Sequence, residues 1–376
     1  MRITHFVVIA ALLASVGAAP GAGLAQDQDR DHRDQDRDRR DQDREHRDQD
    51  REHRDQDRDH RDGDRDRRSP RPTGAVFAPD SFWYTPVPRS APLHPDSAAF
   101  VQEFLRQKKA YYGNVNLNTS RFASPVYVVG PEVATVSVSE WDCQHKRFTD
   151  KNLAQQWSAV PIPTYADPAD GSDAEMSIYQ PSSDSLWEFW RARKSEDGRW
   201  QACWGGRLDH ASRSDGTFPQ HYGTTATSLP FIGGQITSEE LQRGEINHVM
   251  GISLVDVEHY TVVSWPAHRS DGYNPQHQPH RIPEGTRLRL DPAVDVEQLK
   301  LHPVAKAIAR AAQKYGFVIW DKAGAISMRL QNPKSQTARG APDPYPALFQ
   351  GTPSYKILDG FPWDRLQFLT PDYGKH

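Results

Sequence analysis

The sequence predicts a mainly β fold, a β-sandwich or jelly roll with a few peripheral helices, and two observations support this. Short runs rich in β-branched and aromatic residues alternate with turn-forming Pro, Gly, Asn and Asp, and few segments have helical periodicity. All ten Trp of the chain lie between residues 75 and 376, which form the predicted globular domain. A two-domain α+β arrangement is the alternative.

The predicted strands are short and closely spaced. Three of them, 174–179, 186–192 and 200–204, form a predicted meander with turns at 180–184 and 195–198. The other predicted strands span residues 126–129, 134–138, 249–254, 262–265, 287–290, 316–320 and 325–330.

Three segments carry helix signals. Asp96 or Ser97 is suited to cap a helix that runs to Gln107. Thr237-Ser238-Glu239-Glu240 is a capping box that opens a short helix. Residues 302–315 place Val, Ala and Ile at helical spacing, and the following glycine suits a C-terminal cap. These helices lie outside the predicted strands, as expected for peripheral elements.

The chain begins with the layout of a signal peptide, predicted to span residues 1–25. Arg2 supplies a positive charge, residues 6–16 are apolar, and Gly23 and Ala25 suit a cleavage site before Gln26. An N-terminal membrane anchor is the alternative, but the apolar run falls short of the roughly 20 residues that span a bilayer. We expect a secreted protein without a membrane span, extracellular or, in a host with an outer membrane, periplasmic.

Residues 26–74 form a predicted disordered linker. From Asp27 to Arg68 a unit of seven residues, such as DQDRDHR, occurs six times. A coiled coil requires apolar residues at two positions of such a repeat, and this repeat has none. Without apolar side chains to bury, the segment cannot offset its ordering entropy. We expect a solvated spacer or a tether to a charged cell envelope.

Composition narrows the class of protein further. The chain has a net charge of −4, and the linker alone accounts for that value, so the globular domain is nearly neutral. No basic surface for nucleic acid is predicted. Cys143 and Cys203 are the only cysteines, and outside the cytoplasm such a pair is expected to form a disulfide.

The predicted hairpin at 174–192 carries the candidate catalytic residues. If Tyr179 pairs with Leu186, then Ser177 pairs with Glu188, and Glu175 lies diagonal to Glu188 on the same face, with Cβ atoms roughly 7–8 Å apart. Two carboxylates at that separation suit glycoside hydrolysis, in which one protonates the leaving oxygen and the other acts as nucleophile or base. Glu175 and Glu188 are therefore the predicted acid/base pair, with Asp173 tuning their pKa values.

Neighbouring residues suggest how a sugar would bind. Trp187, Trp190 and Trp204 are predicted to stack on sugar rings. The alternative for the whole hairpin is structural, with the acids solvated or paired with arginines and the aromatics in the core.

A second feature is the small-residue run at 223–236, followed by residues 244–248. In a polysaccharide lyase, His248 or Tyr179 would abstract the proton next to a uronate carboxylate, and Gln235 or Asn247 would hold that carboxylate. The alternative for His248 is an interior histidine with satisfied hydrogen bonds.

We expect no cofactor and no metal site. The motifs of Ser-hydrolase, dinucleotide and P-loop NTPase sites are absent from the sequence.

Five stretches resemble a family of uncharacterised secreted bacterial proteins found in actinomycetes and other soil bacteria. They are GSDAEMSIYQPSSDSLWEFWRA, GTTATSLPFIGGQI, GEINHVMGISL, IPEGTRLRLDP and AIARAAQKYGFVIWDKAG. The resemblance covers residues 75–363 and implies no catalytic residues. A looser resemblance links the chain to concanavalin-A-like jelly-roll glycosidases and lyases, although Asp173 and Glu175 lack the fuller acidic signature of those glycosidases.

The sequence therefore predicts a secreted protein that acts on a polysaccharide or a cell-envelope glycan. Glycoside hydrolysis is the first hypothesis, and lyase chemistry in the same cleft is the second. Non-catalytic glycan binding is the third, and it would tolerate loss of the acids.

Overall fold

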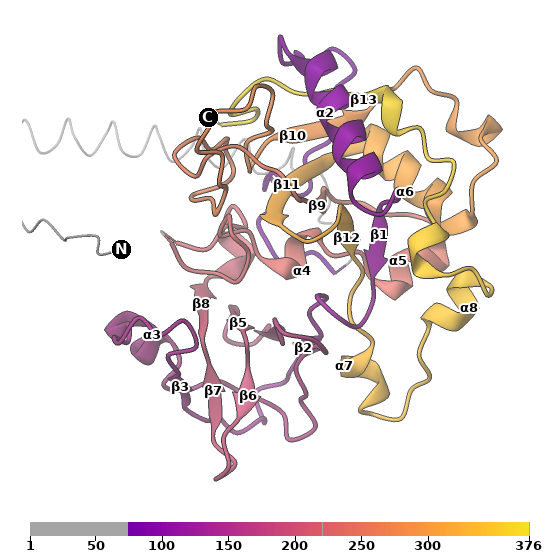
Figure 1. Cartoon of the computed structure of the whole chain (residues 1–376). Coiled ribbons are helices and arrows are strands. Elements are labelled where there is room, and N and C mark those ends of the chain that lie inside the picture. Colours follow the sequence, from indigo (N-terminus) through magenta and orange to yellow (C-terminus); the bar gives the residue numbers. More distant parts are fainter. Residues whose placement is uncertain (1–73, 220, 376) are drawn as a thin grey trace, which may run out of the picture. The chain divides into compact units, whose positions relative to one another are not determined.

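The computed structural model describes residues 74–219 and 221–375, and these contain thirteen strands in three sheets (Figure 1). The largest sheet has six strands in the order β1-β12-β9-β11-β10-β13. It is mixed, because β1 is parallel to β12 and β9 is parallel to β11, whereas the other pairs are antiparallel. Its strands are β1 (Asn116–Asn118), β9 (Met250–Leu254), β10 (Arg287–Leu290), β11 (Phe317–Lys322), β12 (Ser327–Arg329) and β13 (Leu366–Phe368).

The two smaller sheets lie together in the lower part of Figure 1. One has four strands in the order β2-β4-β5-β8, and the other has three in the order β3-β7-β6. Each contains one parallel pair, β2 with β4 and β3 with β7. Their strands are β2 (Val126–Val128), β3 (Val138–Glu140), β4 (Met176–Gln180), β5 (Ser185–Trp190), β6 (Arg193–Lys194), β7 (Trp200–Ala202) and β8 (Trp204–Asp209).

Helices in the described residues are mostly short, and only α2 (Ser97–Ala110) and α6 (Pro303–Lys314) exceed six residues. The His302 side chain accepts a hydrogen bond from the backbone N–H of Val304 and so caps α6. The predicted capping box is present at α5, where Thr237 and Glu240 bond reciprocally. The remaining α-helices are α3 (Lys151–Gln156), α4 (Phe231–Gly234), α5 (Ser238–Arg243), α7 (Lys334–Thr337) and α8 (Tyr345–Phe349).

Four 3₁₀ helices complete the described elements. They connect strands and helices and are η2 (Ala211–Arg213), η3 (Val296–Gln298), η4 (Ser354–Lys356) and η5 (Trp363–Arg365).

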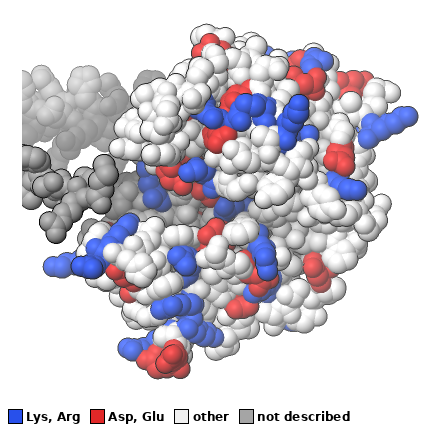
Figure 2. Space-filling model, viewed as in Figure 1, with Lys and Arg blue, Asp and Glu red and all other residues white. Residues whose placement is uncertain are grey.

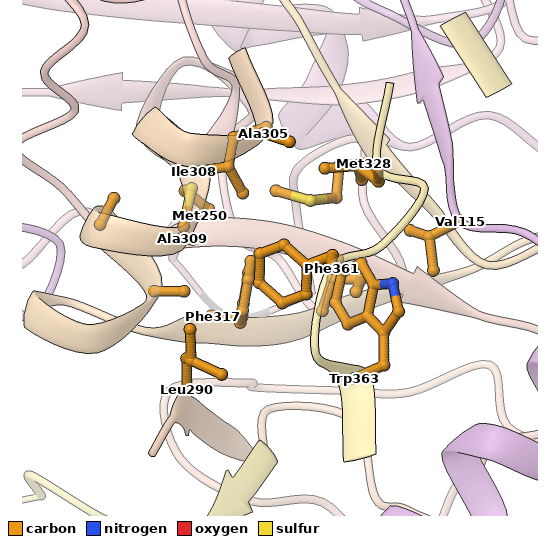
Figure 3. Packing of buried hydrophobic residues seen from close by; sticks show 14 of the residues in the cluster. Val115, Met250, Leu290, Ala305, Ile308, Ala309, Phe317, Met328, Phe361 and Trp363 are labelled. Atoms are coloured by element: carbon orange, nitrogen blue, oxygen red, sulfur yellow. The ribbon is translucent and has the colours of Figure 1, made fainter. Parts of the chain in front are cut away.

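Two large hydrophobic clusters hold these elements together. The first joins the six-stranded sheet to α2 and α6, and Figure 3 shows Met250 and Phe317 of the sheet packed beneath Ala305 and Ile308 of α6. The second contains residues of both larger sheets, including Phe189 of β5 and Trp320 of β11, together with Phe231 of α4. The six-stranded and four-stranded sheets are therefore packed through a common core.

These observations confirm a β-rich fold and refine the predicted elements. The finer expectation of a jelly roll implies antiparallel sheets, whereas each of the three sheets contains a parallel pair. The predicted strand at 262–265 is wrong. Val262 and Val263 are exposed and lie in a loop, where Val263 forms an isolated bridge with Glu284 instead of belonging to a strand. Of the predicted strand at 134–138, only Val138 belongs to a strand.

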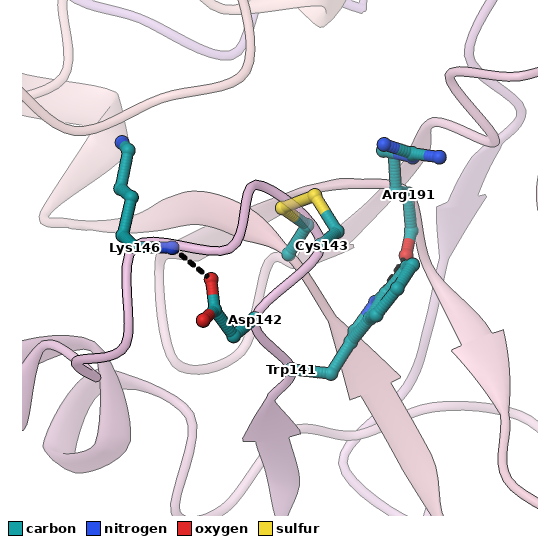
Figure 4. Close-up of a disulfide and its surroundings, with 6 residues drawn as sticks. Trp141, Asp142, Cys143, Lys146 and Arg191 are labelled. Atoms are coloured by element: carbon teal, nitrogen blue, oxygen red, sulfur yellow. Dashed lines mark hydrogen bonds between the residues drawn. A yellow bond between two sulfur atoms is a disulfide. The ribbon is translucent and has the colours of Figure 1, made fainter. Parts of the chain in front are cut away.

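The predicted disulfide is confirmed. Cys143 and Cys203 are bonded, with Cα atoms 5.6 Å apart across a sequence separation of 60 residues. Figure 4 shows the bond beside Trp141 and Asp142, and the Asp142 carboxylate accepts hydrogen bonds from the backbone N–H groups of Lys146 and Arg147. The disulfide thus connects the loop after β3 to the segment between β7 and β8.

The predicted signal peptide and the predicted linker up to residue 73 lie outside the described residues. Within the described part of the chain, no helix combines the length and the apolar character that crossing a bilayer requires.

Candidate functional site

The register of the β4–β5 hairpin is the one expected from the sequence. Tyr179 pairs with Leu186 and Ser177 pairs with Glu188. The Ser177 hydroxyl donates to Glu188 Oε1 at 3.2 Å, so both side chains occupy the same face of the hairpin. Glu175 precedes Ser177 by two residues, but Ala174 has a left-handed backbone with φ 37°, which interrupts regular alternation before it.

Glu188 is enclosed by the protein, with an exposed fraction of 0%. Besides Ser177, the Thr224 hydroxyl donates to Oε2 at 2.8 Å and the Ile232 backbone N–H donates to Oε1 at 3.2 Å. Burial raises the pKa of Glu188 to about 7, and these hydrogen bonds oppose the rise. This carboxyl therefore joins the hairpin to the start of α4 and has the surroundings of a structural group.

Gln235 belongs to the same buried network. The Ser177 and Ser124 hydroxyls are 2.9 Å apart. Gln235 accepts from the Ser124 backbone N–H at 2.7 Å and donates to the Ser124 carbonyl at 3.1 Å. Because both ends of its amide are held by backbone, Gln235 fixes the loop before β2 against α4.

Glu175 lies in a different environment, beside Arg329 of β12. Arg329 donates to Glu175 Oε1 at 3.3 Å and to Asp321 Oδ2 at 2.7 Å. Only 1% of Glu175 and 4% of Arg329 is exposed. Burial raises the pKa of Glu175 to about 7, and the Arg329 charge counteracts this effect. Glu175 is thus brought to a guanidinium 154 residues away in the sequence. The guanidinium carbon of Arg329 also lies over the Phe231 ring, 4.3 Å from its centroid.

A pocket of about 490 Å³ opens beside this ion-pair cluster, and we call it the Arg329 pocket. It contains two carboxylates, Asp173 and Asp271, two cations, Lys322 and Arg329, and two exposed aromatic residues, Tyr112 and Phe122. Its remaining lining residues are Asn116, Asn118, Ala323, Gly324, Ala325 and Ser327. Acids, cations and aromatic rings from four stretches of the sequence, 112–122, 173, 271 and 322–329, therefore converge on one concave site.

The acids around the pocket influence one another. Desolvation raises the pKa of Asp321 to about 6, and the charges of Asp271 and Asp173 raise it further while Arg329 lowers it. Desolvation and the Asp271 charge raise the pKa of Glu284 to about 8. Desolvation also raises the pKa of Asp271, whereas Lys322 and Arg269 lower it. Carboxyls whose pKa values lie near neutrality are typical of acid/base sites.

Backbone strain accompanies this arrangement. Tyr112, Phe122 and Ala174 all have left-handed backbones, with φ of 68°, 58° and 37°. Such conformations cost a non-glycine residue roughly 1–2 kcal/mol and persist only where the surroundings enforce them. The two pocket aromatics and the loop that carries Asp173 are therefore held in unusual backbone conformations.

His248 and Asn247 line a separate cavity of about 530 Å³, together with Glu240. His248 Nε2 lies 3.3 Å from Glu240, and Nδ1 lies 2.8 Å from the Val249 carbonyl oxygen. Burial lowers the pKa of His248, but Glu240 and the Val249 carbonyl outweigh it, so the net shift is upward. Both ring nitrogens are engaged, which makes His248 a bonded interior histidine rather than a free base.

The candidate sugar-binding tryptophans lie elsewhere on the four-stranded sheet. Trp187 is buried and donates to the Gln156 carbonyl at 3.1 Å. Trp204 stacks on His221 and Tyr222, with ring centroids 5.8 and 5.9 Å apart. Trp190 lies opposite Trp204 in the register, and Tyr179 packs against the second cluster. None of these four residues lines the Arg329 pocket.

Sequence reasoning identified Asp173 and Glu175 of this region but missed Asp271, Glu284, Asp321 and Arg329. Asp321 directly follows the predicted apolar strand 316–320, and in the structure it lies near the end of β11. On the face displayed in Figure 2, acidic and basic side chains are interspersed, in keeping with the neutral charge of the domain.

The described residues contain no group of three or more His, Cys, Asp or Glu side chains suited to hold a metal ion. The chain matches no protein-family model, no curated protein and no solved structure.

Proposed function

We propose that this protein is exported and cleaves a polysaccharide by glycoside hydrolysis in the Arg329 pocket. The observation that carries the proposal is the presence of two carboxylates, Asp173 and Asp271, in one pocket with the aromatic rings of Tyr112 and Phe122. Glycosidases use such a pair of carboxyls on the two sides of the scissile bond. Aromatic faces at the pocket provide surfaces on which sugar rings stack.

The two carboxyls have different environments, and this suggests their roles. Desolvation raises the pKa of Asp271, which favours the protonated form that donates to the leaving oxygen. Asp173 then acts as the nucleophile or as the base that activates water. Arg329, which lines the pocket, also holds Glu175 and Asp321, so fixed charges lie next to the pocket in a desolvated setting.

A lyase reaction in the same pocket is the second candidate, and the cations favour it. Arg329 is already paired with Glu175 and Asp321, but the exposed Lys322 also lines the pocket and would neutralise the carboxylate of a uronic acid residue. That neutralisation acidifies the adjacent C–H, from which a base abstracts a proton. Non-catalytic glycan binding remains the third candidate, because aromatic and polar residues suffice for it.

The test is a screen on plant, fungal and bacterial polysaccharides, with reducing ends and absorbance at 235 nm followed in parallel. We expect new reducing ends without absorbance at 235 nm, and loss of about 10³-fold or more of the activity in Asp173→Asn and Asp271→Asn. Asp170→Asn is a matched control from the same loop, since Asp170 is exposed and paired with Lys334. Absorbance at 235 nm would support the lyase instead. Binding without cleavage would exclude both enzyme hypotheses.

The same screen distinguishes two candidate catalytic sites, the Arg329 pocket and the pair Glu175 and Glu188 predicted from the sequence. If Glu188 is structural, Glu188→Gln retains at least a tenth of the activity. If folded Glu188→Gln loses activity and Asp271→Asn retains it, the catalytic site is the β4–β5 hairpin with Glu175 and Glu188.

Export is supported by the signal-like N-terminal sequence and by the Cys143–Cys203 disulfide. Mass spectrometry of the protein from culture medium or periplasm should identify Gln26 as its first residue. A cell-associated protein that still carries residues 1–25 would contradict this part of the proposal.

A further inference from the structure

Arg287 of β10 is a buried arginine without an anionic partner. Only 2% of the residue is exposed. Its guanidinium donates from Nη2 to the Tyr315 carbonyl at 3.0 Å, whereas its Nε–H has no acceptor. Among the described residues, no carboxylate oxygen lies within ion-pair distance of it. Burying a charge without a counter-charge is costly, so this position calls for an explanation.

Arg289, two residues further along the same strand, is a buried arginine whose hydrogen bonds are all accepted by the protein itself. Its guanidinium donates to Gln367 Oε1 at 2.9 Å, to the Pro88 carbonyl at 2.5 Å and to the Arg89 carbonyl at 2.9 Å. All these acceptors belong to the protein. Arg287 has one such acceptor, the Tyr315 carbonyl, and its buried Nε–H has none.

Arg287 lines a pocket of about 580 Å³ that is distinct from the Arg329 pocket, and we call it the Arg287 pocket. Three aromatic residues contribute to its lining, namely Phe82, Trp265 and Tyr373. The Phe82 ring lies 5.6 Å from the Arg287 guanidinium carbon and packs edge-on against Trp265, with centroids 5.4 Å apart. Three exposed charged residues, Asp80, Asp215 and Arg213, also line the pocket, and neither carboxylate forms an ion pair with Arg287.

The charge of Arg287 persists despite burial. Desolvation lowers its pKa to about 10, and a Coulombic interaction with Tyr373 opposes this shift. Arg287 is therefore a cation at neutral pH, in a desolvated setting where a carboxylate would form strong, charge-assisted hydrogen bonds. We propose that the Arg287 pocket binds a carboxylate attached to a ring, with the carboxylate on Arg287 and the ring against Trp265 and Phe82.

Two sources supply this chemistry, a uronic acid residue of a glycan and a free aromatic acid. D-glucuronate and benzoate represent them. Their neutral counterparts, D-glucuronamide and benzamide, keep each ring and remove the charge. We expect saturation-transfer NMR on the full mature protein to detect one or both acids, with each bound acid at least about tenfold tighter than its amide. Equal binding of acids and amides, or no binding of either acid, would overturn the proposal.

Variants locate the site. Arg287→Met should weaken acid binding about tenfold or more, while Arg289→Met is the matched control and should bind normally. If Arg287→Met does not fold, Trp265→Ala serves instead, because Trp265 is only half-buried and its replacement should leave the protein folded. Trp265→Ala should weaken the binding of both acids. Unchanged binding in a folded variant of either residue would refute the assignment.

Asp173→Asn separates this proposal from the proposed hydrolysis. It should abolish cleavage and leave acid binding intact. Acid binding lost together with activity in that variant would place the acid in the Arg329 pocket and overturn the assignment to Arg287.

Discussion

Arg329 and Asp321 form a buried ion pair, with Nη2 and Oδ2 2.7 Å apart, that ties β12 to β11. The same guanidinium reaches Glu175 at 3.3 Å just before β4, so it also ties the six-stranded sheet to the four-stranded sheet. The charge of Arg329 lowers the pKa of both acids, which burial raises. One cation that lines the Arg329 pocket thus keeps two desolvated carboxyls closer to ionisation.

Replacing Arg329 with Met should destabilise the protein by about 3–5 kcal/mol, because it leaves two buried acids without their cation. Urea unfolding at pH 7 measures this difference. Arg310→Met is the control, since Arg310 forms an exposed pair with Glu297 and its loss should have little effect. If the two substitutions lower the free energy of unfolding equally, the buried cluster contributes no more to stability than an exposed ion pair.

Glu188→Gln should make stability less sensitive to pH. Burial raises the pKa of Glu188 from 4.5 to about 7, so the folded state holds this proton more tightly than the unfolded state. Wild-type stability therefore falls as pH rises from about 4.5 to about 7, and the variant lacks this loss. We expect the free energy of unfolding of the variant, relative to wild type, to rise by roughly 3 kcal/mol between pH 4 and pH 8.

Unfolding titrations at several pH values measure this change. Glu297→Gln should show the opposite sign, because pairing with Arg310 lowers the pKa of Glu297. A pH-independent difference between wild type and Glu188→Gln would contradict the burial-driven shift.

Gly251→Ala should destabilise the protein by about 1–3 kcal/mol through overpacking. A Cβ at Gly251 of β9 would overlap the Trp320 ring, which is fully buried and cannot move away. Gly324→Ala is the control, since a Cβ there meets no atom within 4 Å. Thermal unfolding of both variants separates the effect of overpacking at Gly251 from the effect of replacing a glycine in general. If Gly251→Ala does not change stability, Trp320 can move aside at little cost in free energy.

Reducing the Cys143–Cys203 disulfide should cost roughly 4 kcal/mol, the value that the chain-entropy argument gives for a closed loop of 60 residues. Urea unfolding with and without dithiothreitol measures it. The Cys143→Ser/Cys203→Ser double variant should match the reduced wild type and be insensitive to the reductant. A reductant effect that persists in the double variant would have another origin.

Local features were predictable from the sequence. The Ser177–Glu188 register follows from the turn and from alternation along the two strands, and the α5 capping box follows from four consecutive residues. The Cys143–Cys203 bond follows from their being the only cysteines. Each of these features depends on few residues close in sequence or on a unique pairing.

The candidate site was only partly predictable, because it depends on tertiary packing. Glu175 and Arg329 are 154 residues apart, and nothing in either segment specifies the other. The hairpin pattern predicts that Glu188 faces its neighbours on one side of the sheet. It does not show that α4 covers that side and buries the carboxyl.

Strand β11 has a consequence for how the molecule can be divided. Its side chains alternate between the two hydrophobic clusters, with Phe317 and Ile319 in the first and Val318 and Trp320 in the second. A fragment that ends before residue 317 would lack part of both cores, although all strands of the two smaller sheets would be present. The six-stranded sheet and the two smaller sheets should therefore unfold in one calorimetric transition. Neither part should fold independently when the other is removed by truncation.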